Sequence, residues 1–161
     1  MSQKHTAREP QAAVGALLGD VVDLLGGERT LQAPVSSKLD AHELIVKGLP
    51  GAALVNVVRR IRTLKPVEVT RAVGVSLRTV QRRSHAPKSR LSQEQSGRTW
   101  KFAEILAKAT AVLGDQNQAE RWLSMPAMAL DGRRPVDLLA SPAGTELVEQ
   151  LLGRMEYGVY T

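Results

Sequence analysis

The chain has 161 residues, a net charge of +6, 43% hydrophobic residues, 3% aromatic residues and no cysteine. This composition excludes a wholly disordered chain, disulfides, thiolate zinc sites and a cysteine nucleophile, and the length allows one compact domain or two small ones. No apolar run is long enough to span a membrane, and the first ten residues lack the apolar stretch of a signal peptide, so we expect a cytoplasmic protein without a membrane partner.

Apolar residues recur at steps of three and four, which predicts helices throughout. Glycine and proline mark where these helices begin and end; for example, Gly26-Gly27 stops the first helix and Ser141-Pro142 starts the last. In chain order, the expected helices cover residues 11–25, 40–47, 51–62, two short helices within 66–83, a helix from about Leu91 or Arg98 to Leu113, then 118–124, 135–139 and a final helix from Ser141.

The predicted fold class is therefore all-α. We expect an N-terminal helical extension over residues 1–39, a Cro-like helix-turn-helix domain over 40–90 and a small helical domain over 91–161. The polar segment 84–97 contains Pro87 and is predicted to be an interdomain linker or an exposed turn. Residues 11–25 are a candidate for dimerisation, with packing against their own domain as the alternative. The last helix is expected to bury Leu147, Val148, Leu151, Leu152 and Met155.

Positive charge is concentrated in the middle of the chain. Residues 56–97 hold 10 Lys and Arg against 2 Asp and Glu, a net charge of +8, whereas 1–55 and 98–161 each have a net charge of −1. A phosphate backbone favours such concentration through counterion release, so the segment is a candidate for nucleic-acid binding. A basic patch that serves solubility or an acidic protein partner is the alternative.

The basic segment also carries the pattern of a helix-turn-helix. Val69 and Val73 form the inner face of a first short helix, and Gly74 lies where the chain needs a left-handed residue. Ser76 is suited to cap the second helix, and Val80 points back to the core. An ordinary helical hairpin is the alternative, and Thr70 departs from the motif because alanine is usual at that position.

The second helix of this motif is the candidate recognition helix for a major groove. Its outer face holds Ser76, Leu77, Arg78, Thr79, Gln81 and Arg82. Arg78 or Arg82 could contact guanine and Gln81 could contact adenine, since these pairs form two hydrogen bonds with one base. The remaining basic residues, Arg83, Lys88 and Arg90, are expected to hold phosphates.

A second set of motifs lies in residues 91–158. It includes Trp122-Leu123, the pattern L-x-G-x-x-P-x-D-L-L over 130–139 and the pattern L-G-R-x-x-Y-G over 152–158. Together with Gly48-Leu49-Pro50 and the helix-turn-helix, these motifs closely resemble the Xre/MbcA/ParS family of antitoxins over roughly residues 40–158. The chain departs from the family pattern at residues 100–102 and 125–128.

The resemblance implies an antitoxin that is not an enzyme, needs no cofactor and represses its own operon by binding operator DNA. The implied protein partner is a RES-domain toxin, which consumes NAD⁺ or transfers its ADP-ribose, and a homodimer is expected within the complex. The C-terminal domain would bind the toxin and place the tail at its NAD site. The implied toxin-binding residues are Arg154, Glu156, Tyr157, Gly158, Val159, Tyr160 and Thr161.

The tail supports this role independently of the family. Tyr157 and Tyr160 are the two tyrosines of the chain, and this side chain is frequent at interfaces. The alternative for Tyr157 is that it folds back onto the last helix, and Trp122 is expected in the core. Two other functions stay open: a stand-alone helix-turn-helix regulator whose C-terminal domain dimerises or senses a ligand, and a protein-interaction module without an operator.

We find no pattern that predicts catalysis or metal binding. The three histidines, His5, His42 and His85, lie in separate segments without metal-ligand spacing. No nucleophile–base pair and no pair of catalytic carboxylates is recognisable. The sequence therefore predicts no catalytic residue, no metal site and no cofactor.

Overall fold

The computed structural model describes residues 9–158, and in this range it is all-α, as predicted, with no strand. Isolated bridges join Pro50 to Arg90 and Ala127 to Arg133. The helices are α1 Glu9–Leu24, α2 Gly27–Leu31, α3 Lys38–Lys47, α4 Gly51–Arg60, α5 Pro66–Val73, α6 Leu77–His85, α7 Gln93–Leu113, α8 Gln116–Ser124, the 3₁₀ helix η1 Met128–Leu130, α9 Pro135–Leu138 and α10 Pro142–Glu156.

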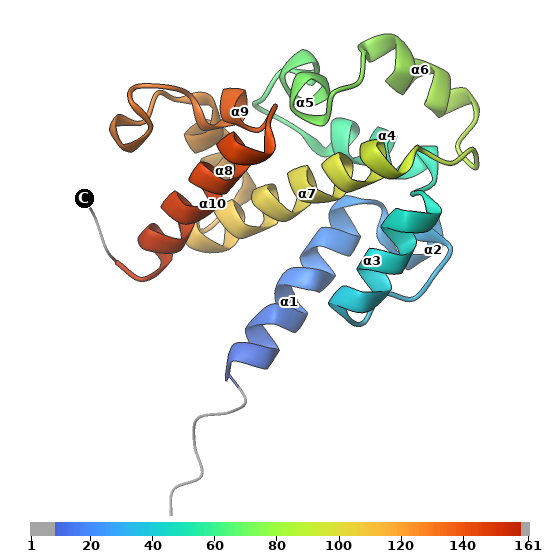
Figure 1. Ribbon diagram of the computed structural model, residues 1–161, viewed down its shortest axis with the longest axis horizontal. Helices are drawn as coiled ribbons and strands as arrows, with labels where there is room; N and C mark the ends of the chain where they lie inside the picture. The colour runs from blue at the N-terminus through green and yellow to red at the C-terminus, as the bar shows by residue number, and fades with distance from the viewer. Residues whose placement is uncertain (1–8, 159–161) are drawn as a thin grey trace, which may run out of the picture.

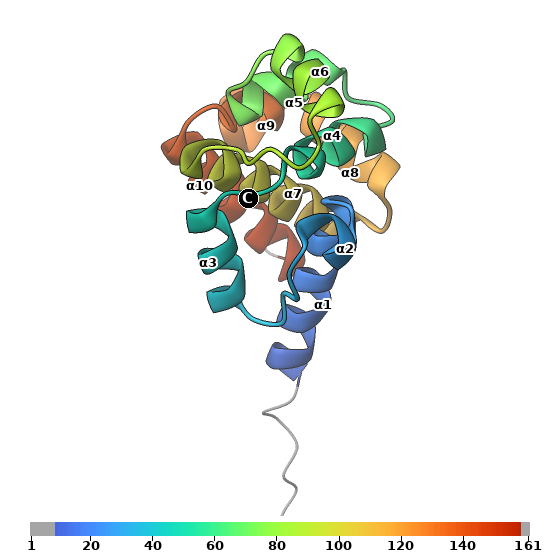
Figure 2. The same ribbon diagram turned by 90° about the vertical axis from the view of Figure 1, so that its right-hand side faces the viewer.

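Helix α7 is the central element of the fold. It crosses the middle of the molecule in Figure 1, with α1–α3 below it, α4–α6 above it and α8–α10 at one end; Figure 2 shows the same arrangement along its length. Its side chains are buried on several faces, because α1, α3, α4, α5, α8 and α10 all pack against it. The buried residues of α7 include Trp100, Phe102, Ala103, Ile105 and Leu106, and they belong to one continuous hydrophobic core.

The start of α7 is set by a capping box. The Ser92 hydroxyl accepts a hydrogen bond from the Gln95 amide at 3.1 Å, and the Gln95 side chain accepts one from the Ser92 amide at 3.2 Å. The helix therefore begins at Gln93, between the two expected starts. The prediction of a polar linker over 84–97 is wrong at both ends, because residues 84–85 belong to α6 and 93–97 to α7.

The segment between α6 and α7 is held against the start of α4. The amides of Gly51 and Ala52 donate to the carbonyl oxygens of Ser89 at 2.7 Å and Pro87 at 3.1 Å, and the Leu91 amide donates to the Leu49 carbonyl at 2.8 Å. The bonds from Gly51 and Ala52 satisfy amides of the first turn of α4, which have no acceptor within the helix. Residues 86–92 are consequently part of the helix-turn-helix body.

Helix α4 ends at Arg60, two residues earlier than predicted, and a buried carboxylate on α8 explains this end. Glu120 Oε1 accepts hydrogen bonds from the three amides that follow the helix, those of Arg62, Thr63 and Leu64, at 2.9, 2.8 and 3.0 Å. Glu120 is fully buried. Its other oxygen, Oε2, accepts from Gln116 Nε2 at 2.9 Å, and Gln116 Nε2 also donates to the Arg60 carbonyl at 2.7 Å. Helix α8 is thereby bound to the connection between α4 and α5.

Two short elements and one buried residue differ from the sequence predictions. Helices α2 and η1 were not expected; each is short and follows a turn, so it carries too few residues for a periodic pattern. Leu147 was expected in the core but is 50% exposed. Val148 and Leu152 are buried as predicted, and Gly144 and Thr145 complete the buried face of α10. Gly144 lies so close to the Leu138 carbonyl that a Cβ would collide with it.

Helix α1 packs against its own domain along its second half, which is one of the two roles that the sequence left open. Val21, Val22 and Leu25 are buried in the core beside α7, so the second half of the expected helix packs onto its own body. Val14, one turn before the half-buried Leu17 and Leu18, is exposed. The first half of α1 therefore remains the candidate dimerisation surface.

We expect Glu120→Ala to lower the free energy of unfolding by about 3 kcal/mol, because three amides of the α4–α5 connection lose their acceptor. Glu120→Gln should cost less, since its amide oxygen still accepts hydrogen bonds. Urea denaturation of both variants, with the exposed Glu146→Ala as control, measures the difference. A Glu120→Ala protein as stable as the control would contradict the role assigned to this carboxylate.

Candidate functional site

The helix-turn-helix has the geometry that its sequence predicts. Gly74 adopts a left-handed conformation, with φ 79° and ψ 30°, and its amide donates to the Thr70 carbonyl at 2.8 Å. The Ser76 hydroxyl accepts from the Thr79 amide at 3.1 Å and so caps α6. Val80 is buried against the core. The fold prediction for this segment is confirmed.

Thr70, the departure from the usual motif, fits without an unpaired polar group. The residue is buried where α5 packs against the rest of the body. Its hydroxyl donates to the Val67 carbonyl at 3.0 Å, within the same helix. A threonine is therefore tolerated at this position, because burial of a hydroxyl costs little when it is hydrogen-bonded.

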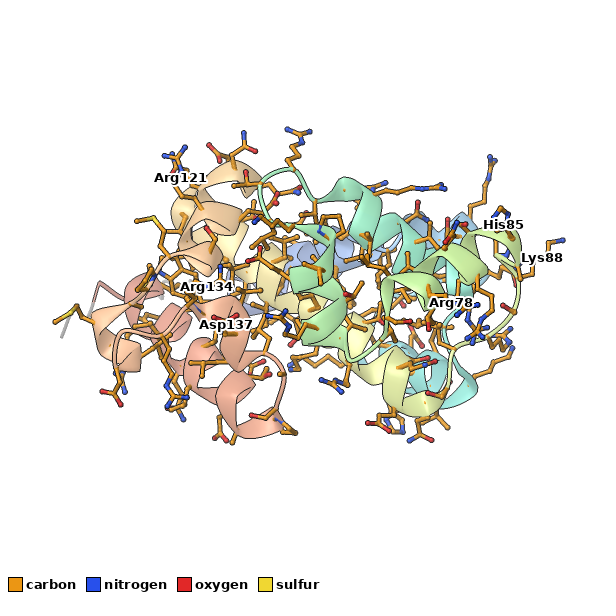
Figure 3. The ribbon with its side chains drawn as sticks, turned by 90° about the horizontal axis from the view of Figure 1, so that it is seen from above. Arg78, His85, Lys88, Arg121, Arg134 and Asp137 are labelled. Carbon is orange, nitrogen blue, oxygen red and sulfur yellow. The ribbon has the colours of Figure 1, made fainter. Side chains whose placement is uncertain are left out.

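Helix α6 presents a row of exposed side chains on the outside of the molecule. Figure 3 shows Arg78 on α6, with His85 and Lys88 at the same end of the molecule. The side chains of Leu77, Arg78, Gln81 and Arg82 are exposed, whereas Ser76 and Thr79 are engaged in the cap, their hydroxyl oxygens 3.0 Å apart. The predicted reading residues are thus on one accessible helix.

Arg83 and Arg90 differ from the other predicted DNA-binding residues, because both hydrogen-bond within the protein. Arg83 Nη1 donates to Ser89 Oγ at 2.7 Å and to the Arg90 carbonyl at 3.3 Å. Arg90 Nη1 donates to the Gly48 carbonyl at 2.7 Å. These arginines hold the 86–92 segment in place after α6, whereas Lys88 is exposed in that segment.

At the other end of the chain, α10 ends at Glu156 and is followed by an exposed aromatic ring. Tyr157 is 81% exposed, so it does not fold back onto α10. Arg154, Glu156 and Gly158 are exposed as well. The other predicted toxin-binding residues, Val159, Tyr160 and Thr161, lie outside the described residues.

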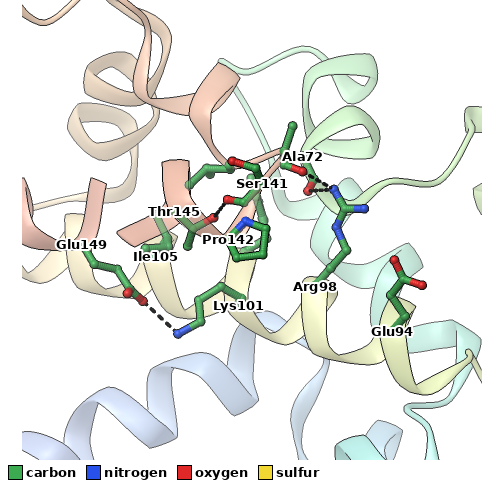
Figure 4. Close-up of a pocket in the computed structure, with 12 residues that line it drawn as sticks. Ala72, Glu94, Arg98, Lys101, Ile105, Ser141, Pro142, Thr145 and Glu149 are labelled. Carbon is green, nitrogen blue, oxygen red and sulfur yellow. Dashed lines mark hydrogen bonds and ion pairs between the residues drawn. The ribbon is translucent and has the colours of Figure 1, made fainter. Parts of the chain in front are cut away.

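Arg98 joins the helix-turn-helix to the C-terminal helices. Its Nη2 donates to the Ala72 carbonyl at 3.2 Å and to the Ala140 carbonyl at 2.9 Å (Figure 4). The guanidinium also fills the space beside Gly74, where a Cβ would collide with it. The positive φ of residue 74 favours glycine, and the arginine packed over it would have to shift to make room for a Cβ.

Arg134 makes a second connection of this kind. Its Nη1 lies 2.7 Å from Glu68 Oε1, while Nε and Nη2 bind both oxygens of Asp137 at 3.0 and 2.9 Å. Glu68 also accepts a hydrogen bond from the Lys65 amide at 3.0 Å, which caps α5. One guanidinium thus holds the start of α5 against α9.

The two carboxylates at Arg134 have lowered pKa values. For Asp137 the main cause is the hydrogen bonding from Arg134. Burial raises the pKa of Glu68, but hydrogen bonds from the Lys65 amide and from Arg134 outweigh it, so the net shift is downward. Both groups are consequently held in the charged form that the arginine binds.

These connecting residues were not predicted from the sequence. Glu120 carried a signal, since it lies on the apolar face of α8 beside Ala119 and three residues before Leu123, where a carboxylate needs a buried partner. Arg134 and Asp137 were noted only as motif letters, although a spacing of three on a helix places such charges side by side. Nothing in the sequence indicated the partner of Arg98, because its acceptors are main-chain atoms.

A cavity of about 570 Å³ lies where α5, α7 and α10 meet. Its lining is largely apolar and includes Ala72, Ile105, Leu139 and Pro142 (Figure 4). Lys101 at its edge is paired with Glu149 at 2.8 Å and with Glu104 at 3.0 Å. Burial lowers the pKa of Lys101, but the hydrogen bonds to these two carboxylates outweigh it and leave the pKa raised.

Within residues 9–158, no three histidine, aspartate or glutamate side chains gather in a way that could hold a metal ion. The helices of the same range are all too short or too polar to cross a membrane.

Most of the chain from α3 to α10 matches known families, in two spans. Residues 40–104 match the antitoxin Xre-like helix-turn-helix domain, and residues 108–158 match the antitoxin Xre/MbcA/ParS C-terminal toxin-binding domain. The two spans meet inside α7, which therefore belongs to both.

Relatives of similar length carry the same description. The chain is 33% identical over 124 residues to an antitoxin Xre of Pseudomonas putida, covering 77% of this chain and 76% of that protein. It is 26% identical over 132 residues to an antitoxin Xre of Photorhabdus laumondii, with 81% and 88% covered. A third antitoxin Xre, from Yersinia enterocolitica, is 33% identical over 101 residues, with 62% and 67% covered.

The lowered pKa values at Arg134 give a pH-dependent prediction. Carboxylates with lowered pKa stabilise the fold above their ordinary pKa of about 4, and this contribution is lost as the pH falls through their folded pKa. Arg134→Gln should lower the free energy of unfolding at pH 7 by roughly 1–2 kcal/mol and should flatten its decline over a pH series from about 5 down to about 2. Urea denaturation across this pH series measures both effects, with the exposed neighbour Arg133→Gln as control. Parallel stability curves for the two variants would show that the ion pairs have no such effect.

Proposed function

The chain belongs to the Xre/MbcA/ParS family of antitoxins, and we propose that it neutralises an NAD-consuming RES-domain toxin of a type II toxin–antitoxin pair and represses the operon that encodes the pair. The observation that carries this proposal is the position of two exposed surfaces. Helix α6 lies at one end of the molecule and the end of α10 lies at the other (Figure 1). One chain is therefore able to bind DNA and a protein at the same time.

The toxin would be blocked by occupation of its active site. We assign this role to Arg154, Glu156, Tyr157 and Gly158, together with residues 159–161. The exposed ring of Tyr157 offers an apolar face and a hydroxyl, a combination that suits a site built for a nucleotide. Blocking of this kind requires no chemistry from the antitoxin, which would act by binding alone and not as an enzyme. The RES-domain identity of the toxin is the one that the family resemblance implies.

DNA would be read by α6. Arg78 and Arg82 have the donors for guanine, Gln81 has the donor and acceptor for adenine, and the exposed Leu77 at the first turn could contact a thymine methyl group. Ser76 and Thr79 at the helix start and the exposed Lys88 would bind phosphates. Arg83 and Arg90 would act mainly by holding the segment that carries Lys88, given their internal hydrogen bonds.

A homodimer would present two recognition helices to the two halves of an operator. The first half of α1, with Val14 exposed and Leu17 and Leu18 half-buried, is the surface that we propose for this contact. It lies on the side of α7 opposite to α6 (Figures 1 and 2), so a contact there would leave both proposed binding surfaces accessible.

A second candidate function is supported by one observation. The cavity of about 570 Å³ adjoins Ala72 at the end of α5, so a small ligand bound there could act on the helix-turn-helix. In that case the protein would be a regulator whose C-terminal domain senses a ligand. Binding of promoter DNA without binding of any RES-domain protein would support this candidate over the antitoxin.

Deletion of residues 157–161 should weaken binding to the RES-domain protein of the same operon by roughly tenfold or more, because an exposed aromatic anchor is removed. The fold should be unaffected, since Tyr157 packs against nothing in the core. Calorimetric titration and rescue of toxin-expressing cells measure the effect, and Arg78→Ala with Arg82→Ala serves as a control that changes only the DNA surface. Full rescue by the truncated chain would refute the role of the tail.

The double variant Arg78→Ala, Arg82→Ala should lose discrimination between promoter DNA and a shuffled duplex, at about 1–3 kcal/mol for each lost base contact. Lys88→Ala should instead weaken binding to both duplexes alike and reduce the slope of log K against log salt by about 1. Fluorescence anisotropy over a salt series distinguishes the two effects. Unchanged discrimination in the double variant would remove these arginines from base recognition.

A further inference from the structure

The loop between α8 and α9 displays two methionine side chains. Met128, the first residue of η1, is 94% exposed, and Met125, at the end of α8, is 55% exposed. Single exposed apolar residues are common on protein surfaces, whereas here two large ones lie three residues apart on one loop. Neither side chain contributes to the hydrophobic core.

The main chain of this loop is held in one shape. The Ala127 amide donates to the Arg133 carbonyl at 3.0 Å, and the Gly132 amide donates back to the Ala127 carbonyl at 2.9 Å. Asp131 and Gly132 both adopt positive φ, 53° and 74°, which turns the chain sharply after η1. Leu130 anchors the turn in the core. The main chain that carries the methionines is therefore held in place, which lowers the main-chain entropy lost when a partner binds.

The position of the loop indicates which partner it meets. Residues 125–134 lie within the span 108–158 that matches a toxin-binding domain. Figures 1 and 3 place the loop at the same end of the molecule as the last turn of α10, away from α6. A protein bound to the tail would therefore be close to the loop, whereas DNA bound to α6 would not.

We propose that Met125 and Met128 form a second contact with the toxin, seated in an apolar recess outside its NAD site, and that this contact determines which toxin the chain binds. The proposal rests on the proposed function. Methionine suits such a contact because it is unbranched, flexible and polarisable, and so fills an irregular recess.

Specificity follows from what each contact touches. A tail that occupies an NAD site meets groups that recognise the nucleotide, and all toxins consuming NAD share that requirement. A contact outside the site meets surface that is free to differ between toxins. Discrimination between partners is a difference of affinities, so it arises mainly where the partners differ.

The test uses the full chain and the RES-domain protein of the same operon in calorimetric titrations. Met128→Asp should weaken binding by roughly tenfold or more, and the double variant Met125→Asp, Met128→Asp should weaken it further. Met128→Leu should bind within about threefold of the unmodified chain, since it keeps an apolar side chain of similar volume. Leu39→Asp, which places the same charge at an exposed apolar residue of α3, should bind unchanged. Thermal melts establish that each variant is folded.

A second titration series uses a RES-domain toxin from another operon. We expect Met128→Asp to weaken binding to the first toxin more than to the second, so that the ratio of the two affinities falls. The proposal is overturned if the double aspartate variant binds the first toxin within about threefold of the unmodified chain. If tail deletion still weakens binding in that case, the proposed function stands without the methionine contact; if the unmodified chain binds no RES-domain protein, both fail.

Discussion

The carboxylate of Glu120 determines how the two functional parts of this molecule are joined. Where α4 ends, three successive amides point toward α8, and a single oxygen accepts all three. Separation of α8 from the α4–α5 connection would leave the Glu120 carboxylate and these three amides without their partners. This loss costs free energy, so the two elements stay together. The packing of α8 therefore fixes where α5 starts, and α5 in turn positions the turn that carries α6.

The same region is supported by two arginines that act across the junction. Arg134 binds Glu68, which caps the start of α5, and Arg98 of α7 binds the Ala72 carbonyl near the end of α5. Both ends of this eight-residue helix are therefore held by residues that follow it in the chain. Helix α7 lies beneath all of these contacts and belongs to both matched spans. The DNA-binding and toxin-binding parts consequently form one body with a shared core, although family descriptions treat them as separate domains.

Much of this organisation was predictable from local patterns, and the rest depends on contacts between distant residues. The helix-turn-helix was predictable because Gly74, Ser76 and Val80 act within a few residues of one another. The end of α4 was not, because its cause, Glu120, lies 56 to 58 residues away. The internal hydrogen bonds of Arg83 were missed for a similar reason: its acceptors belong to a segment that was predicted to be an interdomain linker or an exposed turn. Of the candidate site, the sequence identified the exposed helix and the tail, but not the methionine loop, whose exposure depends on a turn at Asp131.

The glycine of the turn is exposed but lies against a side chain from another element, and this contact limits how the molecule is able to evolve. Gly74 accommodates the guanidinium of Arg98, which also reaches the loop before α10. Exchange of the first 90 residues between relatives, a natural route to a new operator preference, would separate this glycine from the arginine that fills the space beside it. Recombination within the family is therefore expected to preserve α7 and its partners together, and new DNA specificities are expected to arise by substitution on the outer face of α6.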